Sequence, residues 1–212
     1  MEVNCVLNPL RKNYCQVIGL TAAIALGGLL PMTEYTLAQS GDALASLSAQ
    51  EKTSLKSGNA LVEGKDGNYV SRILVTAPLD TAWEVLTDYD NFKKFLPGVV
   101  SSRILETQGN QVVFEQVTQV QLLLLTQRTR LVITAIKQYP QEITFQLKRG
   151  EIKSLKGSWK LEPIAPNQVL ITQEVAFDPG HQIARGLAFS IYKNALADSL
   201  KAIKQETERR VR

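Results

Sequence analysis

The sequence contains very few reactive side chains. Of its 212 residues, two are cysteine and one is histidine. Cys5 and Cys15 both lie near the amino terminus, so thiolate catalysis, a Cys/His zinc site and a disulfide framework are excluded from the rest of the chain. His181 is the single histidine that could act as a general base. Functions that need few titratable groups are therefore favoured.

Charge of one sign is also scarce. The chain has 24 Lys and Arg against 20 Asp and Glu, which gives a net charge of +4. This is not the concentrated basic surface of a nucleic-acid-binding domain, so no nucleic-acid partner is expected. With 44% hydrophobic and 21% charged residues, the composition is that of a globular protein and excludes collagen-like, coiled-coil and wholly disordered chains.

The first forty residues have the pattern of a targeting segment. Arg11 and Lys12 precede an uncharged apolar run over 17–30, and small residues follow at 36–38. This pattern predicts a secretory signal peptide at residues 1–38, and hence export to a periplasm or an equivalent lumen. The alternative is an uncleaved anchor that keeps the protein at a membrane, although the run is shorter than the about 20 residues of a membrane span.

Residues 39–58 are predicted to form a linker and a short helix. The segment starts with residues rich in Ser, Ala and Gly. Ser48 and Glu51 have the spacing of a capping box, and Gly58 supplies a stop, which together predict a helix over about 49–57.

From residue 59 the pattern indicates one α+β domain. Apolar residues alternate with period two over most of 101–177, and turn residues bound each run, which predicts an antiparallel sheet of about seven strands. Two short helices are expected after the first strand, between Pro78 and Pro97. A long C-terminal helix is predicted after Gly180, with an apolar stripe at Ile183, Leu187, Ile191, Ala195, Leu200 and Ile203. A curved sheet wrapped around this helix would leave a ligand cavity between them.

Three segments resemble one family. Residues 77–98, 157–159 and 174–180 are similar to motifs of the START-like (SRPBCC) superfamily, and best match its polyketide cyclase/dehydrase and coenzyme Q-binding START branch. The resemblance implies a helix-grip fold over residues 59–208 with a deep apolar pocket for a lipid, isoprenoid or polycyclic molecule. Members of the superfamily range from lipid and quinone carriers to cyclases, so the fold does not choose the function.

Candidate ligand-binding residues are mainly aromatic. Four of them, Tyr89, Phe92, Phe95 and Leu96, would line the pocket mouth or form a hydrophobic plug under a loop. Others lie on inward faces and are either ligand contacts or plain core, namely Phe145, Trp159, Phe177, Phe189 and Tyr192. Tyr89 and Gln173 are the polar groups expected to orient the head of the ligand.

Four consecutive leucines, Leu122, Leu123, Leu124 and Leu125, break the alternation. At least two of them must point away from the covered face of the sheet. They could enter a membrane surface, form a partner interface, or belong to a strand that is buried on both faces. A basic cluster over 148–160 could assist contact with an anionic bilayer, or be ordinary solvated surface.

The residues favour binding over catalysis. No nucleophile elbow, phosphate-binding loop, dinucleotide fingerprint or zinc-protease helix is present. Glu115 and Glu174 alternate with the apolar sets of their strands, so they are expected to face solvent. We therefore expect no catalytic residue, metal or cofactor, and predict a protein that binds a lipid, quinone or other isoprenoid and transports or shields it near a membrane. The alternative is a cyclase or dehydratase in which a tyrosine or His181 transfers protons.

Overall fold

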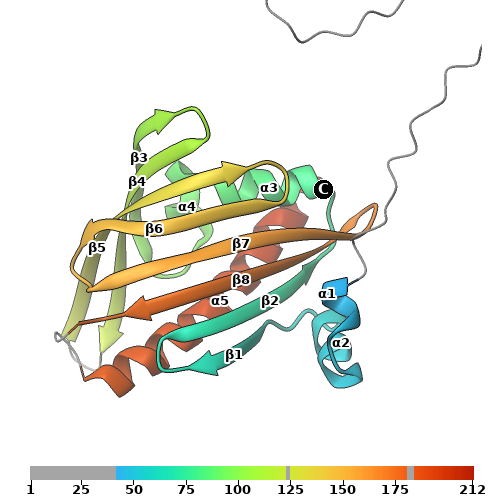
Figure 1. Ribbon diagram of the computed structural model, residues 1–212, viewed down its shortest axis with the longest axis horizontal. Coiled ribbons are helices and arrows are strands. Elements are labelled where there is room, and N and C mark those ends of the chain that lie inside the picture. The colour runs from blue at the N-terminus through green and yellow to red at the C-terminus, as the bar shows by residue number, and fades with distance from the viewer. Residues whose placement is uncertain (1–41, 123–124, 181–183) are drawn as a thin grey trace, which may run out of the picture. The chain divides into compact units, whose positions relative to one another are not determined.

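Eight antiparallel strands form one sheet in the part of the chain that the structure describes. The computed structural model describes residues 42–122, 125–180 and 184–212. The strand order is β1-β2-β8-β7-β6-β5-β4-β3 (Figure 1). The strands are β1 Leu61–Lys65, β2 Asn68–Val75, β3 Val99–Gln108, β4 Gln111–Leu122, β5 Leu125–Gln138, β6 Glu142–Gly150, β7 Ser154–Ala165 and β8 Gln168–Asp178.

The first hairpin adds one strand to the expected sheet. Asp66 and Gly67 form its turn with φ angles of 53° and 88°, the left-handed region that an Asp-Gly turn favours. The resulting strand β1 pairs only with β2 and forms one edge of the sheet. The sheet therefore has eight strands rather than about seven, and the short helices follow the second strand instead of the first.

Helices cover the concave side of the sheet. The connection from β2 to β3 contains α3 (Leu79–Thr87), the single 3-10 turn η1 (Tyr89–Asn91) and α4 (Phe92–Phe95). The long helix α5 (Arg185–Val211) lies across the same face, as Figure 1 shows. Ile73, Ile171 and Leu200 are completely buried between the sheet and α5. This arrangement confirms the predicted helix-grip architecture.

The apolar stripe predicted for α5 is only partly correct. Leu200 and Ile203 are buried, but Leu187 is half exposed and Ile183 lies outside the described residues. Residues spaced by four lie about 40° apart around the helix axis, so a stripe that keeps this spacing turns away from the sheet. The face that meets the sheet instead follows Ala188, Leu196 and Leu200.

A small second cluster lies on the convex side of the sheet. The helices α1 (Asp42–Ala45) and α2 (Ala49–Lys56) precede the sheet, and α2 begins with the predicted capping box between Ser48 and Glu51. Leu55 of α2 packs with Leu74 and Leu170, which point away from the main core. The predicted signal segment lies outside the described residues.

Candidate functional site

A cavity of about 310 Å³ lies between the concave face of the sheet and α5. This volume is at the lower end of the range of about 300–1,000 Å³ that is common for small-molecule sites. Its walls come from the short helices, from six of the strands and from one face of α5. The cavity therefore occupies the space that remains between the curved sheet and the helix it surrounds.

The long hairpin of β4 and β5 forms one wall. Alternate residues of the two strands face the cavity, and they lie opposite each other in register: Phe114 with Ile133, Gln116 with Leu131, Thr118 with Thr129, and Val120 with Gln127. Period-two alternation therefore gives this wall an apolar section followed by a polar one.

Helix α5 forms the facing wall. Ala188, Tyr192, Leu196, Ser199 and Ile203 line the cavity at spacings of three and four residues, which keep side chains on one helix face. Most of these side chains are small or aliphatic, so they leave room next to the sheet. Tyr192 and Ser199 are two turns apart and add hydroxyl groups to this wall.

Aromatic side chains lie on both sides of the cavity. On one side the rings of Phe177 and Tyr192 stack with centroids 4.2 Å apart. On the other side Tyr89 stacks on Phe114 at 4.4 Å, and Phe92 meets Tyr89 edge-on at 5.4 Å. Stacked and edge-to-face pairs of this kind hold aromatic walls rigid and leave ring faces for a flat ligand.

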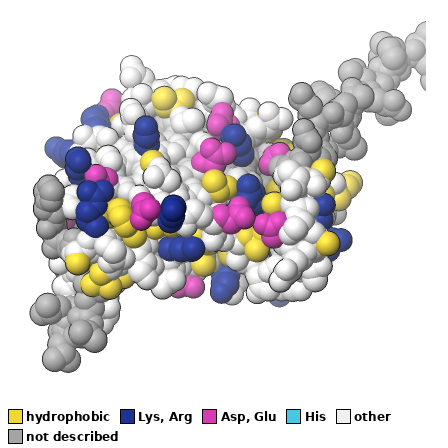
Figure 2. All heavy atoms as spheres, turned by 60° about the horizontal axis from the view of Figure 1, so that its bottom comes forward, with side chains coloured by type: hydrophobic (Ala, Val, Ile, Leu, Met, Phe, Trp, Pro, Cys, Tyr) yellow, Lys and Arg dark blue, Asp and Glu magenta, His cyan; other side chains and the backbone are white. Residues whose placement is uncertain are grey.

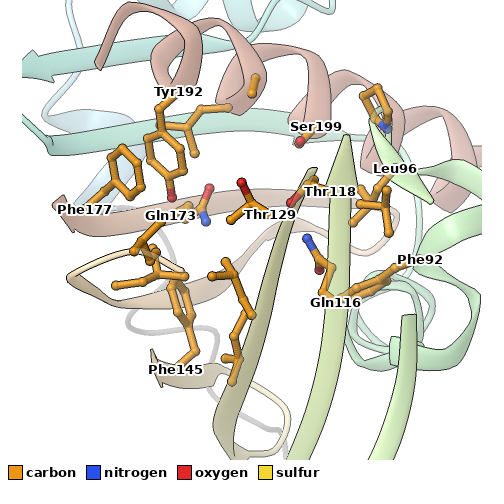
Figure 3. A pocket seen from close by; sticks show the side chains of 18 of the residues that line it. Phe92, Leu96, Gln116, Thr118, Thr129, Phe145, Gln173, Phe177, Tyr192 and Ser199 are labelled. Carbon is orange, nitrogen blue, oxygen red and sulfur yellow. The ribbon is translucent and has the colours of Figure 1, made fainter. Parts of the chain in front are cut away.

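Uncharged polar groups lie between these aromatic groups. Figure 3 shows the ends of Gln116, Thr118, Thr129, Gln173 and Ser199 turned toward the same central space, with Phe145 and Phe177 on one side and Phe92 and Leu96 on the other. We call these five residues the polar belt. Their side chains come from four elements, β4, β5, β8 and α5, so the belt crosses the cavity.

Two tyrosines in the cavity wall remain protonated at any ordinary pH. Burial raises the pKa of Tyr89 well above its usual value, and burial together with the nearby Tyr69 does the same for Tyr192. The Tyr89 hydroxyl is buried and has no hydrogen-bond partner among the described residues. Both phenols can donate a hydrogen bond but are poor bases.

Seven of the nine predicted ligand-binding residues line the cavity. They are Tyr89, Phe92, Leu96, Phe145, Trp159, Gln173 and Tyr192. Phe95 and Phe189 are half-buried and lie outside the lining: Phe95 packs edge-on against Phe92, and Phe189 packs against Phe177 and under the Arg185 guanidinium. The structure places these side chains, and their contact with a ligand stays a prediction.

Most residues of the polar belt carry no recognisable signal in the sequence. Gln116, Thr118, Thr129 and Ser199 were not singled out, because isolated Gln, Thr and Ser residues on a strand or helix are ordinary surface residues in a sequence. The alternation of β4 carried a usable signal, since Gln116 and Thr118 share the face of Phe114.

Glu115 is less exposed than the sequence predicts. Glu115 points to the convex side as predicted, but it is only 8% exposed because Arg103 and Arg130 cover it at 3.1 and 3.4 Å. It therefore belongs to a surface ion cluster. Glu174 is exposed and pairs with Lys160. His181 lies outside the described residues, and within the described ranges no three His, Cys, Asp or Glu side chains are grouped to hold a metal.

One end of the cavity lies beside the β6–β7 turn and the end of β8, where Glu151 is exposed. Val120, Gln127, Glu151, Ile152 and Pro179 line this end. Val120 and Gln127 lie two residues inward from Leu122 and Leu125, the last pair of the β4–β5 hairpin. Leu123, Leu124 and the side chains of Leu122 and Leu125 lie outside what the structure describes. Among the described helices, none has the length and hydrophobicity needed to cross a bilayer.

The fold and the enclosed apolar site define a START-like helix-grip protein. Residues 75–204 match the family model described as polyketide cyclase / dehydrase and lipid transport, and the chain belongs to this family. No curated protein sequence gives a significant match.

Solved structures share the fold at low sequence identity. A STAR-related lipid transfer protein from Xanthomonas axonopodis is 21% identical, with a TM-score of 0.56, over 70% of this chain and 92% of that one. The Zhui aromatase/cyclase from Streptomyces sp. R1128 is 18% identical, with a TM-score of 0.54, over 68% and 95%. Human STARD10 is 14% identical, with a TM-score of 0.55, over 70% and 68%. These likenesses concern the fold, and they include one protein named for lipid transfer and one named as an aromatase/cyclase.

Proposed function

We propose that this protein binds a hydrophobic small molecule in the cavity and carries or shields it, with a quinone or other isoprenoid lipid as the ligand class in view. The observation that supports this most directly is the cavity itself, an apolar space walled by two aromatic groups and closed by α5. Apolar ligand surface that leaves water for such a site gains about 25 cal/mol per Å².

A cavity-filling variant tests this proposal. Ser199→Phe places a ring in the cavity from α5, whereas Ser190→Phe places the same ring on the exposed face of the same helix. Native mass spectrometry of protein purified from its own membrane fraction should detect a lipid-sized adduct on the parent protein and on Ser190→Phe. Ser199→Phe should lose the adduct while keeping its helical circular dichroism. A parent protein without any adduct would contradict the proposal.

The alternative function, a cyclase or dehydratase, is supported by Tyr192. Its buried phenol lies in the cavity next to Gln173 in Figure 3 and can donate a proton or a hydrogen bond. Against it, the described cavity lining has one carboxylate, Glu151, at the mouth, and this group already accepts the Arg130 backbone N–H at 2.7 Å. An enzyme should lose turnover in Tyr192→Phe at unchanged ligand affinity, whereas a carrier has no turnover to lose.

The proposal includes peripheral contact with a membrane through Leu122, Leu123, Leu124 and Leu125. The β4–β5 hairpin supports it, because the cavity-lining pair Val120 and Gln127 lies two residues inward from Leu122 and Leu125. A ligand could then pass between bilayer and cavity without crossing water. Figure 2 shows Lys and Arg mixed with Asp and Glu on one face, so general electrostatic attraction is a weak alternative there. Leu123→Ser with Leu124→Ser should reduce binding to phosphatidylcholine–phosphatidylglycerol vesicles and leave the melting temperature nearly unchanged. A large loss of stability would favour a doubly buried strand.

Export through cleavage of residues 1–38 is also part of the proposal. The apolar run and its basic flank support it. Amino-terminal sequencing of the protein from its native host should begin at Gln39 if the signal is removed. A chain that still begins at residue 1 or 2 and sediments with membranes would favour the anchor.

A further inference from the structure

One end of the molecule carries an excess of positive charge. The first residues of β5, the β6–β7 turn and the start of α5 all lie at this end, on the left side of Figure 1. Their described residues include five exposed cations and two acids, namely Arg128, Arg130, Arg149, Lys153 and Arg185 against Glu151 and Asp178. The β1–β2 turn adds one charge of each sign, Lys65 and Asp66. We call this end the basic end.

The opposite end has the reverse charge. The β5–β6 turn, the β7–β8 turn and the first half of α3 lie there, on the right side of Figure 1. Their described residues include one cation and four acids, namely Lys137 against Asp80, Glu84, Glu142 and Glu162. The cations Lys204 and Arg210 of α5 are paired with acids. A negatively charged surface therefore attracts the basic end and repels the opposite one.

The cations of the basic end are held weakly by the protein itself. Lys153 and Arg185 share a single acid, Asp178, at 3.2 and 3.6 Å, and both are more than half exposed. Arg149 is exposed and forms no ion pair within residues 42–122, 125–180 and 184–212. Exposed ion pairs contribute little to stability, so phosphate groups of a partner can replace Asp178 at low cost.

Apolar surface lies beside these cations. Leu187, in the first turn of α5, is 51% exposed. Two residues that line the cavity, Glu151 and Ala195, are also exposed, and the lining residue Ile191 is half-buried. The cavity therefore reaches the molecular surface near the basic end. Cations next to exposed aliphatic side chains are typical of surfaces that meet both lipid headgroups and acyl chains.

Resting on the membrane contact in the proposed function, we infer that the basic end docks on an anionic bilayer, with Arg149, Lys153 and Arg185 at lipid phosphates and Leu187 in the interface. Away from this end, Lys and Arg are mixed with Asp and Glu, as Figure 2 shows for one face, so the attraction also sets the orientation. Docking in this orientation brings the opening of the cavity to the bilayer.

Vesicle sedimentation tests the class of lipid. The protein should bind phosphatidylcholine vesicles that contain about 30% phosphatidylglycerol at least about tenfold more tightly than pure phosphatidylcholine vesicles, because each cation near an anionic surface strengthens binding about fivefold. Sodium chloride at about 1 M should remove most of this difference, since it shortens the Debye length to about 3 Å.

Charge variants locate the docking surface. Lys153→Gln with Arg185→Gln should weaken binding to the anionic vesicles by about 25-fold, which is about fivefold for each cation. Lys201→Gln with Arg212→Gln is the matched control, because it removes the same charge from exposed positions further along α5, and it should change binding by less than about twofold. Asp178→Asn should strengthen binding by about two- to fivefold, because it removes an acid and releases both cations.

A second pair of variants tests the apolar contact. Leu187 and Val211 are 51% and 49% exposed and lie at opposite ends of α5. Leu187→Ser should weaken binding to the anionic vesicles about fivefold, because less apolar surface leaves water on docking. Val211→Ser should leave binding unchanged.

The outcomes separate this inference from the proposed function. Equal binding to both kinds of vesicle, or equal effects of the two double charge variants, would overturn docking through the basic end. Equal binding that is nevertheless lost in Leu123→Ser with Leu124→Ser would overturn it too, while supporting membrane contact through the leucines. The lipid-sized adduct in native mass spectrometry depends on the cavity alone, so it reports on ligand binding whichever way the vesicle experiment turns out.

Discussion

The two ends of α5 are attached to the rest of the protein in different ways. Near its C-terminal end, Lys204 Nζ donates to the Leu74 carbonyl at 2.9 Å and pairs with Glu208. Glu208 in turn accepts the backbone N–H of Thr76 at 2.9 Å, at the end of β2. These contacts fasten the helix to the sheet through half-buried groups.

A second set of contacts joins the same end to the short helices. Arg210 pairs with Asp88 at 2.6 Å and with Glu206 at 2.8 Å, and all three side chains are less than 25% exposed. Asp88 directly precedes Tyr89, which lines the cavity. The C-terminal end of α5 therefore holds the segment that carries Tyr89 in position.

The N-terminal end is attached more loosely. Asp178 binds Lys153 at 3.2 Å and Arg185 at 3.6 Å, but both cations are more than half exposed. Ala184, the residue before the helix, provides no side-chain cap, and Leu187 is exposed. Exposed ion pairs contribute little to stability, about 0.2–1 kcal/mol each.

The comparison indicates that the two ends of α5 have different roles. The firmly attached end supplies stability, and the more loosely attached end lies near the lining residues Ile152 and Pro179, where we expect the ligand to enter. Local opening in proteins occurs where buried contacts are few. We therefore expect changes at the C-terminal end to alter the free energy of unfolding, and changes at the N-terminal end to alter the rates of ligand exchange.

The largest expected effect comes from two leucines of α5. Leu200 is fully buried and Leu187 is 51% exposed. Leu200→Ala should lower the free energy of unfolding by about 2–5 kcal/mol, because it leaves a cavity in the core. Leu187→Ala should change it by less than about 0.5 kcal/mol. Urea denaturation followed by circular dichroism measures both, and similar losses for the two variants would break the comparison.

An intermediate effect is expected from Glu206. Hydrogen bonds from Arg209, and then from Arg210, lower the pKa of this carboxyl group to about 2. Glu206→Gln should cost about 1–2 kcal/mol at neutral pH, because it removes charge-assisted hydrogen bonds that are partly exposed. Asp178→Asn, at the other end of the helix, should cost less than about 1 kcal/mol.

The pH dependence of the Glu206 effect follows from the lowered pKa. The folded state binds this proton more weakly than the unfolded state, so the ionised carboxylate stabilises the fold above its usual pKa of 4.5. This contribution is lost as pH falls from about 4.5 to about 2. Unfolding curves of the parent protein and Glu206→Gln should therefore converge in this range, and a constant difference down to pH 2 would contradict the assignment.

The smallest expected effect is kinetic. Asp178→Asn weakens the ion pairs that join the β6–β7 turn to the start of α5. Association and dissociation of anthraquinone, used as a flat uncharged probe of the cavity, should both accelerate by about two- to fivefold at nearly constant affinity, because only the opening step becomes easier. Stopped-flow quenching of Trp159 measures the rates. Unchanged rates, or a change in dissociation alone, would place the entry path elsewhere.

Much of the fold could be predicted from the sequence because its signals are local. The capping box at Ser48 and Glu51, the Asp66–Gly67 turn and the alternation of β6 each depend on neighbouring residues, and all are present in the structure. The exposure of Leu187 depends on which elements lie nearby, so the local pattern did not resolve it.

The candidate site could be predicted only in part. Tyr89, Phe145 and Trp159 were recognised because large aromatic residues on an inward face must pack against something. Thr118 and Ser199 are 81 positions apart in the sequence. They were missed because no local pattern in either segment indicates that the two side chains face the same cavity. Phe189 packs against the lining residue Phe177 but lies outside the lining itself, one helical step from Ala188, and its contact with a ligand stays a prediction.

The sequence by itself determined the chemistry that is available to this protein. One histidine and two early cysteines leave few groups for catalysis, and the alternation over 101–177 followed by a long helix indicates a sheet packed on a helix. Only the tertiary structure decided that uncharged polar groups from β4, β5, β8 and α5 meet in the middle of an apolar cavity, and that one end of α5 is held more firmly than the other. The physical reason is that periodicity fixes the face on which a side chain lies, whereas strand register and helix packing fix what it faces.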